Sequence, residues 1–193
     1  MEQQLIYQFD EDVFRIEDPG LHISINEAST DCASTSIARH DGTVMLVSTF
    51  KNERLHGPSR SYFANGALAS ERWFYEGQAH GQSLEYAISG SLLSRKGYVH
   101  GRLEGKYLQW HPSGKLQLSG FFQNGVPDGL FELFFTDGLP LRTVTFTNGR
   151  RNGLDTGWTE EGYLLFCEFW TGGQRQKSLL PDGLARGLGV GEA

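Results

Sequence analysis

Cysteine is scarce in this chain of 193 residues, which contains only Cys32 and Cys167. The two thiols lie far apart and lack the close spacing of metal ligands, so they exclude a disulfide-stapled scaffold and predict free cysteines of a reducing compartment. No apolar run approaches the ~18 residues that a membrane-spanning helix needs. The opening Met1–Gln4 is polar, unlike a basic leader followed by an apolar stretch. We therefore expect a cytoplasmic protein.

Basic residues are also few. The sequence has 17 Lys and Arg against 23 Asp and Glu, a net charge of −6. Only Arg95-Lys96 and Arg150-Arg151 form dense basic pairs, whereas nucleic-acid binding needs a basic stripe with interleaved aromatics. The composition therefore excludes nucleic acid as the expected partner.

Catalytic signatures are missing as well. There is no nucleophile elbow, phosphate loop or Cys-His signature, and the pair Glu160-Glu161 falls in an expected turn. Equivalent positions of neighbouring units lie roughly 10 Å apart in a sheet, too far for zinc bonds of ~2.1 Å. We predict no catalytic residue, cofactor or metal ligand, and turn-stabilising roles for the histidines His56, His80, His100 and His111.

Glycine, by contrast, is abundant, with 25 residues, and most of them recur every 24 residues. A repeat at fixed period decides the fold before any single element does. The three series are Gly57, Gly81, Gly105, Gly129 and Gly153; Gly42, Gly66, Gly90, Gly114, Gly138 and Gly162; and Gly77, Gly101, Gly125, Gly149 and Gly173.

Apolar residues keep the same period and predict two short strands per unit. Polar-Gly pairs such as Asn124-Gly125 indicate turns, because glycine adopts positive φ without a Cβ clash. No stretch sustains a helical period. Pro140 replaces a leucine of the series, and from it we expect a strand that is kinked or starts late. The aromatic series are Tyr62, Tyr86, Trp110, Phe134 and Trp158; and Phe50, Phe74, Tyr98, Phe122, Phe146 and Trp170.

The unit GKYLQWHPSGKLQLSGFFQNG, beginning at Gly105, resembles the MORN repeat. It is most similar to the bacterial variant of the YwqK-type antitoxin-like family. The resemblance covers about residues 41–175. It implies an all-β fold: a single-layer antiparallel β-hairpin solenoid, elongated and twisted, with an N-terminal β cap. It also implies an interaction module rather than an enzyme.

Residues 1–39 lie outside the repeat and carry the whole net charge, with eight acids against Arg15 and Arg39. Alternating stretches at 5–9 and 21–25 predict strands, and the small polar residues 27–36 predict a loop. Two roles are open: a cap that pairs with the first repeat strand, or an acidic arm that binds a partner. Residues 40–176 hold five to six repeats, and 177–193 form a flexible tail or cap.

We assign the regular positions Leu116 and Phe122 to the inner face of the sheet. The opposite face is less regular, and its aromatics are candidate partner contacts because exposed apolar patches mark binding surfaces. Ordinary packing is the alternative. The candidate partner-binding residues are Phe63, Trp73, Tyr107, His111, Phe121, Phe135 and Phe169, with Asp10, Glu11 and Asp12 of the arm.

The expected function is non-enzymatic protein binding by a repeat scaffold. The resemblance implies an antitoxin or immunity protein as the sharper form and a chaperone-like scaffold as the broader one. The acidic arm favours a basic protein partner, since charge complementarity raises association rates. The alternatives are peripheral association with phospholipid membranes and a targeting subunit for an enzyme on another chain.

Overall fold

The computed structural model describes residues 6–9, 12–15, 21–29, 32–39 and 41–180, and this part of the chain contains strands but no helix. Two sheets form. The hairpin β1–β2 makes one alone, and the other has 16 strands. The strands of the N-terminal half are β1 Ile6–Phe9, β2 Asp12–Arg15, β3 Leu21–Ser29, β4 Cys32–Arg39, β5 Val44–Lys51, β6 Arg54–Tyr62, β7 Leu68–Tyr75, β8 Gln78–Tyr86 and β9 Leu92–Val99. Those of the C-terminal half are β10 Arg102–Leu103, β11 Gly105–Trp110, β12 Leu116–Gln123, β13 Val126–Pro127, β14 Gly129–Phe134, β15 Pro140–Thr147, β16 Arg150–Trp158, β17 Leu164–Thr171 and β18 Gln174–Ser178.

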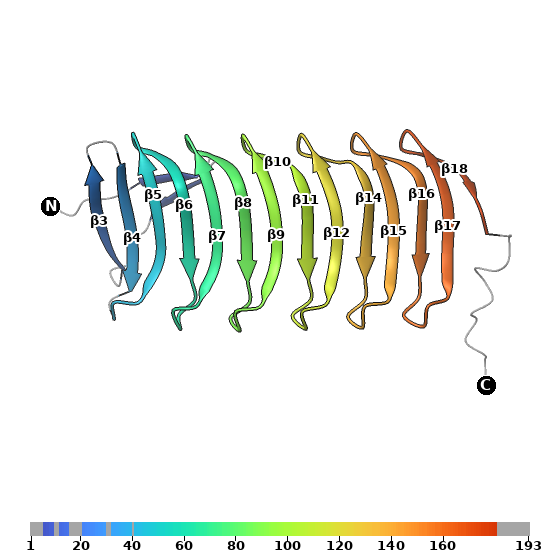
Figure 1. Ribbon diagram of the computed structural model, residues 1–193, viewed down its shortest axis with the longest axis horizontal. Helices are drawn as coiled ribbons and strands as arrows, with labels where there is room; N and C mark the ends of the chain where they lie inside the picture. Colours follow the sequence, from blue (N-terminus) through green and yellow to red (C-terminus); the bar gives the residue numbers. More distant parts are fainter. Residues whose placement is uncertain (1–5, 10–11, 16–20, 30–31, 40, 181–193) are drawn as a thin grey trace.

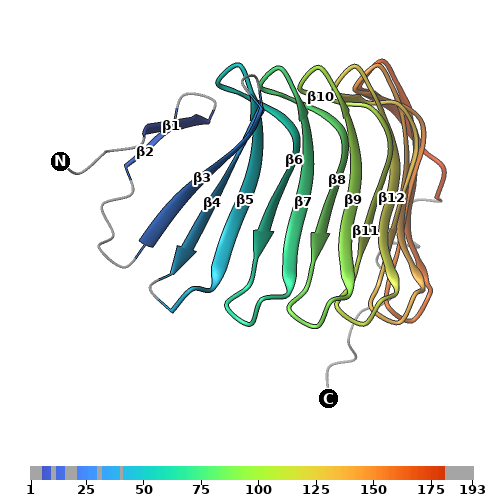
Figure 2. The same cartoon turned by 60° about the vertical axis from the view of Figure 1, so that its left-hand side comes forward.

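The large sheet is a single curved layer in which the strands follow one another in chain order (Figure 1). Its order runs from β18 to β3 without a crossover, and every described pairing is antiparallel, from β3–β4 to β17–β18. Turning the molecule shows the strands bowed in the same sense along its length (Figure 2). The predicted elongated all-β hairpin solenoid is confirmed.

Two kinds of turn alternate along the sheet, as the glycine series predicts. In the tight turns both central residues have positive φ, for example 52° at Asn124 and 85° at Gly125. This is the combination that a type I′ hairpin turn requires. In the longer turns a polar side chain caps the backbone, as where the Ala67 N–H donates to Oδ1 of Asn65 at 3.0 Å.

Five of the tight turns, those at Gly77, Gly101, Gly125, Gly149 and Gly173, are also bonded to the preceding unit. The Gly125 N–H donates to the Leu103 carbonyl at 2.9 Å, and the Asn124 N–H donates to Oε2 of Glu104 at 2.8 Å. The same side-chain contact recurs one unit later between Asn148 and Asp128. The residue 20 positions before a turn thus stabilises it.

The core lies on one face, which we call the inner face. All buried side chains of the described residues lie on this face except that of Thr156. In the central units Phe122, Phe131 and Phe146 contact one another edge to face, with ring centroids 5.4 and 5.2 Å apart. The assignment of Phe122 to the inner face is confirmed.

One local prediction is wrong, and so is one of the two alternatives expected for Pro140. The loop expected at 27–36 is instead the end of β3 and most of β4, because β4 pairs with β3 on one side and β5 on the other. Such pairing outweighs the composition of small polar residues. Pro140 begins β15 at the position where Leu116 begins β12, so this strand does not start late.

The pairing of β4 with β5 is the contact expected of an N-terminal cap. At the other end, β18 stops at Ser178, and the Leu179 N–H still donates to the Cys167 carbonyl at 2.7 Å. Most of the predicted tail, 181–193, lies outside the described residues.

Candidate functional site

The face opposite the core, which we call the outer face, carries a row of exposed apolar side chains in its C-terminal half. The cross-strand pairs Leu130↔Thr145 and Leu154↔Phe169 place these residues on one face of neighbouring strands. Phe121 lies on the same face. Ser119 and Glu132 are paired across β12 and β14, Phe121 is two residues from Ser119, and Leu130 is two residues from Glu132, so all four lie on one face. We call this the outer-face row, and it consists of Phe121, Leu130, Thr145, Leu154 and Phe169.

Four members of the outer-face row are large, and none is covered. Their exposed fractions are 45% for Phe121, 51% for Leu130, 47% for Leu154 and 38% for Phe169. One residue comes from each of five consecutive strands, β12 and β14 to β17. With strands about 4.8 Å apart, the row extends roughly 19 Å along the sheet. The polar, half-buried Thr145 divides the row into two exposed apolar pairs, Phe121 with Leu130 and Leu154 with Phe169. Exposed apolar groups that gather on one face are typical of a binding surface.

Trp73 is exposed on the same face but stands apart from the outer-face row. It lies on β7, and three strands of the sheet separate β7 from β12. Its Nε1–H donates to Oε1 of Glu71 at 3.1 Å, and Nε of Arg60 donates to Oε2 of the same carboxylate at 2.6 Å. Burial alone would raise the pKa of Glu71, but these two hydrogen bonds outweigh it and lower the pKa below its ordinary 4.5.

The remaining predicted contacts are not part of the outer-face row. Phe63, His111 and Phe135 are half-buried where the longer turns begin. Nε2 of His111 lies 3.0 Å from the Phe134 carbonyl of the next unit. Tyr107 lies on the inner face against Phe122, with ring centroids 5.8 Å apart, and burial raises the pKa of its phenol.

Of the predicted acidic arm, Asp10 and Glu11 lie outside the described residues, and Asp12 begins β2. The role of residues 1–39 as a cap or as an acidic binding arm stays a prediction. Cys167 is a free thiol, as expected, and Oγ1 of Thr156 donates to its sulfur at 3.4 Å.

The histidines make contacts that the sequence did not predict. The rings of His80 and His100 lie 5.1 Å apart, and Tyr75 stands between His56 and His80 at 5.0 and 5.8 Å. The His100 N–H donates to Nδ1 of His80 at 3.5 Å, which supports the predicted turn-stabilising role. The signal was available in the sequence, since 20 residues separate this pair as they separate Glu104 from Asn124.

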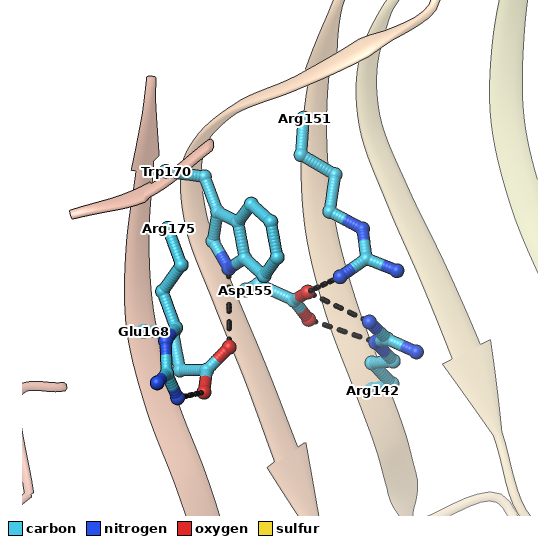
Figure 3. A network of polar contacts seen from close by, with 6 residues as sticks. All are labelled: Arg142, Arg151, Asp155, Glu168, Trp170 and Arg175. Carbon is cyan, nitrogen blue, oxygen red and sulfur yellow. Dashed lines mark hydrogen bonds and ion pairs between the residues drawn. The ribbon is translucent and has the colours of Figure 1, made fainter. Parts of the chain in front are cut away.

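A network of charged and aromatic side chains occupies the inner face at the C-terminal end of the sheet (Figure 3). At its centre Asp155, only 1% exposed, accepts two hydrogen bonds from Arg142, both 2.7 Å long. These bonds raise the pKa of Arg142 above its ordinary value. The pairing of Arg142 with Asp155 could not be predicted from the sequence, because it depends on the register of β15 and β16.

Across the described ranges, no three His, Cys, Asp or Glu side chains are grouped in a way that would hold a metal ion. In the same ranges no helix has the length and apolarity to cross a membrane.

Comparison with known families identifies two segments of the chain as MORN repeat variants, residues 55–76 and 103–124. The first segment spans β6 and β7, the second β10 to β12. The two matches begin 48 residues apart, twice the 24-residue period, so they are in phase with the structural units. A search of the curated proteins finds no match. Two segments of the chain are therefore similar to MORN repeats, a family of repeats that is in general non-catalytic and associated with protein or membrane interaction.

Proposed function

We propose that this protein is a non-enzymatic scaffold that binds another protein through the outer-face row. The observation that carries the proposal is that four large apolar side chains of the outer-face row are exposed on one face of neighbouring strands, namely Phe121, Leu130, Leu154 and Phe169. These side chains do not contribute to the packed inner face, so a partner that docks on the outer face can bury them. At about 25 cal/mol per Å² of apolar surface, covering these side chains is a substantial driving force for association.

The acidic arm gives the proposal its finer form, a basic partner. Asp10, Glu11 and Asp12 stand in a segment that carries all of the chain's net charge. A basic partner would be steered to this end and then docked along the sheet. An antitoxin or immunity protein bound to a basic toxin is the sharper version, and a chaperone-like scaffold for an effector is the broader one.

Affinity capture followed by a titration tests the proposal. A protein captured from native cells is purified and titrated against the intact chain and against the double variant Leu130→Ser/Leu154→Ser. We expect the double variant to weaken binding at least tenfold. The matched control is Ile88→Ser, because Ile88 is 61% exposed but belongs to a turn away from the row. Equal affinities of the double variant and the wild type would refute the proposed surface.

The identity of the captured protein separates the finer versions. A basic toxin supports the antitoxin form, an effector supports the chaperone form, and an enzyme makes this chain its targeting subunit. The variant Asp10→Asn/Glu11→Gln/Asp12→Asn should slow association and reduce its salt dependence if the arm steers the partner. Unchanged association kinetics would leave residues 1–39 as a cap only.

Peripheral membrane binding is the second candidate, and one observation favours it. Exposed lysines flank the outer-face row, Lys106 beside Phe121 and Lys177 beside Phe169. Apolar side chains with basic neighbours suit an anionic bilayer surface, where each Lys near the surface contributes about 1 kcal/mol. Flotation with vesicles of phosphatidylcholine, with and without phosphatidylserine, tests it. No co-flotation with either vesicle would rule the membrane out.

A further inference from the structure

The charged network on the inner face is unexplained by protein binding through the outer face. Its members come from the last four strands of the sheet, β15 to β18, and their side chains converge (Figure 3). We call it the arginine cluster, and it consists of Arg142, Arg151 and Arg175 with the acids Asp155 and Glu168.

Asp155 holds two guanidinium groups close together. Its Oδ2 accepts from Nη2 of Arg142 at 2.7 Å and lies 3.2 Å from Nη1 of Arg151. Nη2 of Arg142 and Nη1 of Arg151 are therefore at most 5.9 Å apart, which is the sum of these two distances. The carboxylate is therefore fully engaged, and two arginine side chains converge around it.

Both guanidinium groups keep N–H donors for another acceptor. A guanidinium carries five N–H groups. Arg142 uses two of them on Asp155, and Arg151 makes one ion pair with it. Within the described residues no other acceptor is bonded to either group, and their side chains are 34% and 38% exposed. The remaining donors can therefore reach a ligand from solvent.

An aromatic ring lies under each of these two guanidinium groups. Cζ of Arg142 lies 5.5 Å from the centre of the Phe166 ring, and Cζ of Arg151 lies 4.6 Å from that of Trp170. A guanidinium that is stacked on a ring and held by a carboxylate loses little freedom when it binds an anion. The preorganisation is that of a binding site.

The charge balance of the cluster favours an anion. Three arginines stand against two carboxylates, and Arg175 is itself paired with Glu168 at 2.9 Å. The cluster thus has a net charge of +1 in a chain whose net charge is −6.

We propose that Arg142 and Arg151 together bind an oxyanion, a phosphate or carboxylate group, on the inner face of the sheet. The planar forks of two arginines match the paired oxygens of these groups. Asp155 acts as the positioning residue, which holds the two forks at one point. The site is separate from the outer-face row, so the failure of one proposal leaves the other standing.

Nuclear magnetic resonance of the intact, ¹⁵N-labelled chain tests the site. The probes are sodium phosphate and sodium acetate, each added at constant ionic strength against sodium chloride. We expect saturable shifts of the Arg142 and Arg151 Nε–H signals, and of the Trp170 Nε1–H signal next to them. Saturation by phosphate alone would assign the site to phosphate groups, and saturation by acetate would assign it to carboxylates as well.

Neighbouring arginines provide a matched control. Arg151→Gln should weaken binding at least tenfold, while Arg150→Gln, with the same change of charge on an exposed residue next to it, should leave affinity unchanged. Arg151→Lys keeps the charge but loses the fork, and it should fall between them; it also serves if the glutamine variant does not fold. Non-saturable shifts in the wild type, or equal losses in the Arg150 and Arg151 variants, would overturn the proposal.

Discussion

Gly120 lies against the ring of Phe131 on the inner face. A Cβ added at Gly120 would stand 2.3 Å from Cε1 of Phe131, closer than any real side-chain contact. Gly120 has no positive φ, so the ring rather than the backbone requires glycine here. The small residue and the large ring fill one site together across β12 and β14.

Gly120→Ala should therefore destabilise the protein by about 2 kcal/mol, the usual cost of overpacking a core. Urea unfolding measures the loss. Adding Phe131→Leu should recover part of it, because the smaller side chain makes room for the methyl group. Ser119→Ala, on the other face of the same strand, serves as the control. If the double variant loses the sum of the two single effects, Gly120 and Phe131 are not coupled as the structure indicates.

The relation between Gly120 and Phe131 also shows what the sequence alone predicts. Gly125 belongs to a series with fixed period, so its turn was predictable from spacing. Gly120 belongs to no series, and its necessity comes from a residue on another strand. Gly157 is the same case, with a built Cβ 2.3 Å from Cε1 of Phe166.

The candidate surface was predicted in part for a similar reason. Phe121 and Phe169 were predicted because they are aromatic residues of the less regular face. Leu130 and Leu154 are aliphatic, so a prediction based on aromatics did not include them. The register of β14 and β16 brings them between the two phenylalanines. Tyr107 was grouped with these residues because it varies between units, yet the alternation along β11 puts it on the inner face.

Arg142→Met should cost about 3 kcal/mol of unfolding free energy. The substitution leaves Asp155, which is 1% exposed, with one ion pair at 3.2 Å. Breaking a buried pair in this way leaves a poorly compensated charge. Lys96→Met is the control, since Lys96 pairs with Glu85, whose side chain is 41% exposed. Exposed pairs contribute at most about 1 kcal/mol. Similar losses for both variants, measured in urea, would contradict the special role of Asp155.

Glu71 should make stability depend on pH in the acid range. Burial raises its pKa, but hydrogen bonds from Arg60 and Trp73 outweigh this and hold the folded-state pKa below 4.5. A carboxyl group with a lowered pKa stabilises the fold above its unfolded pKa, and the effect is lost as pH falls through the folded value.

The wild type should therefore exceed Glu71→Gln in stability at pH 7, and the difference should shrink as pH falls below 4.5. Urea unfolding from pH 7 to pH 3 measures it. Because both proteins share all other titrating groups, their difference isolates Glu71. A difference that stays constant with pH would mean that the glutamine variant fails for reasons of packing.

The tight turns offer a stabilising substitution at Glu76. This residue has φ 49°, in the left-handed region that asparagine occupies in the equivalent turns at Asn124 and Asn148. A residue with a Cβ costs about 1 kcal/mol or more of stability in the left-handed region, and asparagine costs the least of the non-glycine residues. Glu76→Asn should therefore raise the free energy of unfolding by up to about 1 kcal/mol. Glu76→Gln removes the same charge without this backbone preference and should change little. The reverse exchange, Asn124→Gln, should lower the free energy of unfolding by a similar amount. It tests the backbone preference alone, because the backbone N–H that donates to Glu104 stays in place. If the asparagine and glutamine variants of Glu76 are equally stable in urea, the conformation of the turn does not limit the stability of this unit.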